Sequence, residues 1–69
     1  MRITLNNKEE FIETDKNSLS VNEILNIKKY SYNRIIVKIN NQLIKKEDYE
    51  DTKVTIGDNV MIIHLMAGG

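Results

Sequence analysis

The chain has 69 residues, and ten acidic and ten basic side chains give it a formal net charge of zero. A chain of this length forms one small domain with little room for a pocket that encloses both a substrate and catalytic groups. The balanced charge gives no reason to expect binding to nucleic acid or to an anionic membrane.

Residue counts exclude several further classes. The chain has no cysteine, which rules out disulfides, thiolate zinc sites and a thiol nucleophile. Its single histidine, His64, rules out a multi-histidine metal site, so we expect no intrinsic cofactor. No stretch approaches the roughly 20 apolar residues of a membrane-spanning helix. The N-terminus has the pattern of a strand rather than a signal peptide, and we expect a cytoplasmic protein.

The first third of the chain predicts a β-hairpin. Apolar residues alternate with polar ones over residues 1–5, which is typical of a half-buried strand. Asn6-Asn7 is a turn pair, because asparagine tolerates positive φ. Residues 8–13 then return as the second strand, and we interpret residues 14–19 as a loop.

A helix follows. Ser20 and Glu23 have the spacing of a capping box, in which each side chain bonds the other residue's backbone N–H. The apolar positions behind them have helical spacing: Val21, Ile24 and Leu25. We therefore expect a helix over about residues 20–30, with Lys28 and Lys29 near the negative end of its dipole.

The second half of the chain predicts more strands. Residues 34–39 are rich in β-branched side chains and predict a strand. A second turn pair, Asn40-Asn41, leads to the short apolar stretch 43–44. Residues 45–53 are charged and irregular, with one helical turn expected around Tyr49.

Gly57-Asp58 marks a turn before the last strand. Strands flanking one central helix in so short a chain predict the α+β class, as a mixed sheet of four to five strands packed on one helix. We expect the first and last strands side by side and parallel at the sheet centre, which is the β-grasp arrangement. The predicted core is Ile3, Leu5, Val21, Ile24, Leu25, Val37, Ile39, Val60 and Ile62.

The sequence ends in Gly68-Gly69, after an apolar run and Ala67. Glycines lack Cβ atoms, so this segment is thin and free in φ and ψ. We expect a folded domain over residues 1–66 and a flexible tail over 67–69. Such a tail suits delivery of a terminal carboxylate into another protein's active site.

The last strand is apolar on both faces, with Val60 and Ile62 on one and Met61, Ile63 and Leu65 on the other. A single helix covers only one face of a sheet. We therefore predict that the second set, with Met66 at its edge, forms an exposed patch that docks partners. We expect His64 to be a surface residue of the strand rather than an acid or base.

The whole chain resembles the sulfur carrier proteins of thiamine biosynthesis, the ThiS family, which have the ubiquitin-like β-grasp fold. The matching pieces lie in the family's order: the opening hairpin, Ser20-Val21-Asn22-Glu23-Ile24-Leu25, Val37-Lys38-Ile39-Asn40, Gly57-Asp58 with Val60 and Ile62, and Ala67-Gly68-Gly69. Lys45-Lys46 stands where some members have a proline, a departure that touches no functional residue.

The resemblance implies a protein co-substrate rather than an enzyme. An adenylating enzyme of the ubiquitin-activating type would use ATP to activate the carboxylate of Gly69. A persulfide sulfur donor would convert that group to a thiocarboxylate, and thiazole synthase would accept the sulfur. Gly68 and Ala67 would keep the tail thin enough for both enzymes.

Three alternatives stay open at this stage. The small subunit of molybdopterin synthase shares the fold and tail, although it is usually longer and often has prolines ahead of the tail. A ubiquitin-like modifier would join Gly69 to a lysine in an isopeptide bond. A β-grasp interaction module would use only the domain surface.

Overall fold

The computed structural model describes residues 1–30 and 33–65. Seven strands and one α-helix occur within those ranges, together with a single 3-10 turn. In chain order the elements are β1 (Arg2–Leu5), β2 (Lys8–Phe11), β3 (Ser18–Ser20), α1 (Val21–Ile27), β4 (Ile35–Ile39), β5 (Gln42–Ile44), η1 (Lys46–Asp48), β6 (Lys53–Thr55) and β7 (Asn59–His64).

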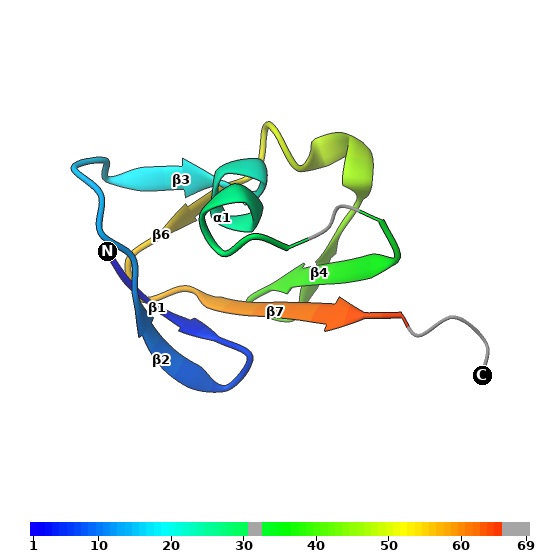
Figure 1. The fold of residues 1–69 in the computed structure, drawn as a ribbon, viewed down its shortest axis with the longest axis horizontal. Helices are drawn as coiled ribbons and strands as arrows, with labels where there is room; N and C mark the ends of the chain where they lie inside the picture. Colours follow the sequence, from blue (N-terminus) through cyan, green and yellow to red (C-terminus); the bar gives the residue numbers. More distant parts are fainter. Residues whose placement is uncertain (31–32, 66–69) are drawn as a thin grey trace.

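The main sheet has five strands in the order β2-β1-β7-β4-β5 (Figure 1). The first and last strands, β1 and β7, lie side by side and parallel at its centre. Strand β2 flanks that pair on the β1 side and the hairpin β4–β5 flanks it on the β7 side, where β7 runs antiparallel to β4. The predicted mixed sheet with parallel central strands is therefore confirmed.

Both hairpins turn through an Asn-Asn pair, as the sequence predicts. The φ angles are 51° and 68° at Asn6 and Asn7, and 50° and 70° at Asn40 and Asn41. Positive φ at both central residues gives the turn whose twist matches that of the flanking strands. The same left-handed region recurs at Gly57, where φ is 86° just before β7.

A second, two-stranded sheet corrects one prediction. Residues 14–19 do not form only a loop, because β3 pairs antiparallel with β6 beside α1 (Figure 1). Leu19 stands opposite Val54 in this ladder, and both are fully buried. Each strand has three residues and places one large apolar side chain in the core, so neither shows the alternation over four to eight residues that identifies a strand in a sequence.

The helix begins as predicted and ends earlier. The Ser20 hydroxyl accepts a hydrogen bond from the Glu23 N–H at 3.1 Å, and the Glu23 carboxylate accepts one from the Ser20 N–H at 3.0 Å. The helix ends at Ile27, with Lys28 as its C-cap, and Lys29 has a φ of 60°. Lys28 instead donates from Nζ to the Glu10 carboxylate at 2.8 Å, which ties the helix end to β2.

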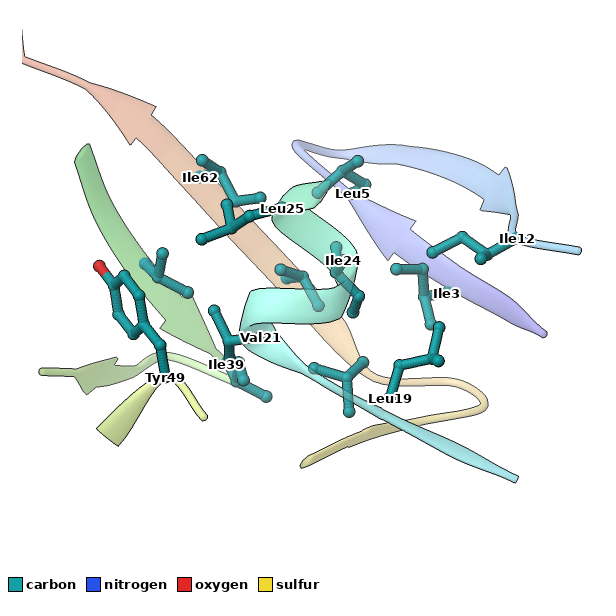
Figure 2. Close-up of a cluster of buried hydrophobic side chains, with 13 residues drawn as sticks. Ile3, Leu5, Ile12, Leu19, Val21, Ile24, Leu25, Ile39, Tyr49 and Ile62 are labelled. Carbon is teal, nitrogen blue, oxygen red and sulfur yellow. The ribbon is translucent and has the colours of Figure 1, made fainter. Parts of the chain in front are cut away.

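The hydrophobic core lies between α1 and one face of the main sheet (Figure 2). All nine residues predicted for the core are buried. Four more complete it: Ile12, Leu19, Tyr49 and Val54. Tyr49 directly follows η1, the helical turn expected there, and burial raises the pKa of its phenol.

Candidate functional site

The predicted sulfur-carrying residue Gly69 and its neighbours Gly68, Ala67 and Met66 lie outside the described residues. The structure does describe the strand that leads to them. Leu65 extends the ladder between β7 and β4, because its N–H donates to the Arg34 carbonyl at 2.7 Å. The backbone up to residue 65 is thus held by β4 and by Arg34, which precedes it.

Strand β7 has the two apolar faces that its sequence predicts. Val60 and Ile62 point into the core and are 2% and 3% exposed. On the other face Met61 is half-buried, whereas Ile63 and Leu65 are 38% and 48% exposed. Large apolar side chains therefore lie on the side of the sheet away from α1, immediately before the C-terminal residues.

Two neighbouring strands extend this surface beyond the predicted residues. Ile36 of β4 stands directly opposite Ile63, and Lys38 stands opposite both Met61 and, on β5, Leu43. Directly opposed residues project from the same face of a sheet. Leu43 is 60% exposed and Ile36 is half-buried.

We call this surface the open apolar face; it consists of Ile36, Leu43, Met61, Ile63 and Leu65, with the exposed Lys38 among them. Sequence reasoning missed Ile36 and Leu43. The alternation in residues 34–39 could have indicated Ile36, but its place opposite Ile63 depends on the pairing of β4 with β7. The place of Leu43 depends on the register that the Asn40-Asn41 turn sets between β4 and β5.

His64 is exposed, as predicted, and lies at the end of β7 on the opposite face, across from Ile35. Its ring centroid is 5.3 Å from that of Tyr30, with the ring planes at 38°. Tyr30 follows the helix and donates its backbone N–H to the Leu25 carbonyl at 2.8 Å. The ring contact therefore joins the end of the helix to the end of the strand.

Within residues 1–30 and 33–65 there is no group of three or more His, Cys, Asp or Glu side chains that could hold a metal ion. A hollow of about 390 Å³ is lined by Met1, Lys16, Asn17 and Ile56. It lies at the end where the chain starts, whereas β7 points away from that end (Figure 1). No helix of the described part is long and apolar enough to cross a membrane.

The parallel central strands, the two flanking hairpins and the helix on one face define a β-grasp fold of the ubiquitin-like type. Residues 3–69 match the sequence model of the ThiS family, and the chain belongs to that family.

Two solved structures of a thiamine biosynthesis protein (ThiS) from Geobacter metallireducens are similar to this chain. The crystal structure has a TM-score of 0.86 and 30% sequence identity, with all of both chains covered. The solution structure has a TM-score of 0.83 and 30% identity, and covers all of this chain and 88% of that one. No curated protein sequence matches the chain.

Proposed function

We propose that this protein is a sulfur carrier of thiamine biosynthesis and that Gly69 is the group that carries the sulfur. The observation that carries the proposal is the open apolar face, which leads along β7 directly into Ala67-Gly68-Gly69. Family membership supports it, because the match runs through residue 69 and the similar solved structures are ThiS proteins. The domain acts as a handle and the terminus as the reacting group.

The chemistry starts from a carboxylate, which is a poor electrophile because its negative charge repels nucleophiles. An adenylating enzyme of the ubiquitin-activating type transfers AMP from ATP to the Gly69 carboxylate and releases pyrophosphate. The terminal sulfur of a cysteine persulfide attacks the acyl carbon, and AMP leaves. A second thiol cleaves the resulting acyl disulfide and frees the thiocarboxylate, which is a nucleophile for thiazole synthase.

The open apolar face is the docking surface in this proposal. An exposed apolar patch rimmed by polar residues is typical of a protein interaction site. Lys38 lies between Met61 and Leu43, so the complementary surface is apolar with an acidic group opposite Lys38. Because the surface adjoins the strand that carries the tail, docking brings the terminus to the partner's active site.

The test is mass spectrometry of the protein after incubation with its adenylating enzyme, ATP, a persulfide donor and a thiol. The expected product is heavier by about 16 Da, because sulfur replaces one oxygen in the thiocarboxylate. Oxidation of any of the three methionines adds nearly the same mass. The mass shift must therefore require ATP and map to Gly69. The product must also react with a thiol-alkylating reagent, which is diagnostic in a chain without cysteine.

A matched pair of variants tests the docking surface in the same reaction. Ile63→Asp places a charge on the open apolar face and should slow thiocarboxylate formation. Ile56→Asp places the same charge on an isoleucine that is 72% exposed beside the hollow and should not. An unmodified Gly69 under conditions where the matched enzyme turns over a known carrier would refute the proposed function. A product that delivers sulfur only to molybdopterin synthase would reassign the acceptor.

A further inference from the structure

The central strand β7 is longer than its parallel neighbour. Pairing with β1 covers only Thr4 with Asn59 and Leu5 with Val60, because the chain turns away at Asn6. Pairing with β4 continues on the other side as far as His64. Beyond Val60, therefore, β7 has a strand on one side only (Figure 1).

The register shows which backbone groups point to the side without a strand. Leu65 bonds the Arg34 carbonyl on the β4 side, and hydrogen-bonded pairs alternate along an antiparallel ladder. Residues 61, 63 and 65 thus direct their backbone groups toward β4. Residues 60, 62 and 64 direct theirs away from it, toward β1.

Asn6 bonds two of the backbone groups that point toward β1. Its N–H donates to the Val60 carbonyl at 2.9 Å, and its side-chain Oδ1 accepts from the Ile62 N–H at 2.7 Å. Beyond that point the Ile62 carbonyl and the His64 N–H and carbonyl remain. Within the part of the chain that the structure describes, the ladders of β7 with β1 and β4 supply no strand partner for these three groups. We call them the free β7 edge.

We propose that the free β7 edge accepts an extended segment of the adenylating enzyme as an added strand; this inference rests on the proposed function. His64 is exposed, and its N–H and carbonyl are a main-chain donor and acceptor in strand geometry, for which an extended backbone supplies the complement. A helix does not, because its own backbone groups are paired internally. The edge also continues directly into the tail that the enzyme must receive.

Strand addition here would fix where Gly69 lies in the active site. Residues 65–69 span at most about 18 Å when extended. A slip of one residue in the added strand would move the terminal carboxylate by about 3.3 Å along the strand. Docking on the open apolar face sets the partner's position across the sheet, whereas pairing along β7 sets its register.

The first test is hydrogen exchange of backbone amides, measured by NMR in the free protein and in its complex with the adenylating enzyme. The Ile63 and Leu65 amides, which bond β4, should be protected in both states. The His64 amide should exchange freely in the free protein and at least about tenfold more slowly in the complex. Unchanged exchange at His64 in a saturated complex would overturn the proposal. Protection that instead rises with protein concentration without enzyme would also overturn it, because a second copy would then occupy the edge.

The second test removes the donor at His64. His64→Pro deletes an N–H that makes no bond to β4, and a strand tolerates proline where its N–H faces outward. His64→Ala is the matched control, because it loses the imidazole and keeps the N–H. The affinity of His64→Pro for the enzyme should be about fivefold to tenfold lower than that of His64→Ala. Equal affinities would refute strand addition.

A semisynthetic chain with an ester in place of the Ile63–His64 amide decides the matter if the proline variant fails to fold. It removes the same donor without restricting φ, and it should show the same loss relative to the all-amide chain. The experiments can refute the proposed function and the proposed strand addition independently of each other. A wild-type protein that is not adenylated removes the proposed function, whereas an adenylated wild type with full affinity in the ester variant removes only strand addition.

Discussion

Truncating Leu25 to alanine should destabilise the domain by about 3–5 kcal/mol, because this side chain lies at the centre of the core and is 0% exposed. Removing its three terminal carbon atoms forfeits about 2.4 kcal/mol of transfer free energy at roughly 0.8 kcal/mol per group. The remainder comes from the cavity, which α1 and the sheet cannot close by collapsing. A domain of this size has a total stability of about 3–10 kcal/mol, so the change removes a large share of it.

Urea unfolding followed by circular dichroism measures this loss, and thermal unfolding should show the melting temperature falling by about 12–40 °C. The matched control is Leu43→Ala, which makes the same truncation on a residue that is 60% exposed. It should change the free energy of unfolding by no more than about 0.5 kcal/mol. A loss below about 1 kcal/mol for Leu25→Ala, or equal losses for the two variants, would refute the placement of the core between α1 and the main sheet.

Two further predictions concern single polar contacts. The pKa of Glu23 is lowered from 4.5 to about 2, chiefly by the hydrogen bond from Lys16, so the stability it contributes is full above pH 4.5 and is lost as the pH falls toward 2. The stability difference between the wild type and Glu23→Gln should therefore shrink over that interval in acid titrations of the unfolding midpoint, and a constant difference would contradict the assignment. Asn6→Gly keeps the positive φ of the turn but loses the acceptor for the Ile62 N–H, and should lower the free energy of unfolding by about 1–2 kcal/mol. Asn7→Gly, at a φ of 68°, should be neutral or slightly stabilising in the same urea experiment, and equal losses at the two positions would show that the side-chain bond contributes nothing.

The parts of the fold that follow from local sequence could be predicted. The capping box at Ser20 and the Asn-Asn turns act over a few residues, and the order of strands around one helix leaves few topologies. Strands β3 and β6 could not be predicted, because Leu19 and Val54 become a pair only once the chain has folded. The helix ends early because Lys29 has a φ of 60° and the Tyr30 N–H donates back to the Leu25 carbonyl, a stop that no glycine in the sequence marks.

For the site, alternation along the last strand correctly separates the buried Ile62 from the exposed Ile63 and Leu65. It cannot find Ile36 or Leu43, because their place on the open apolar face depends on the register between strands. Nor can it show that Asn6 ends the pairing with β1. The end of this pairing depends on which residue of β7 lies beside the turn at Asn6, and β7 is more than fifty residues further along the sequence.

The placement of β7 between β1 and β4 has a consequence for synthesis on the ribosome. Strand β7 follows both hairpins in the chain and joins them, so the nascent chain has no way to complete this sheet until residues 59–64 have emerged. A chain truncated before Asn59 lacks the centre of the sheet and leaves both hairpins with exposed apolar surface, which cells remove by proteolysis. The integrity of the main sheet therefore depends on the strand that pairs with both hairpins, and on the completion of its synthesis.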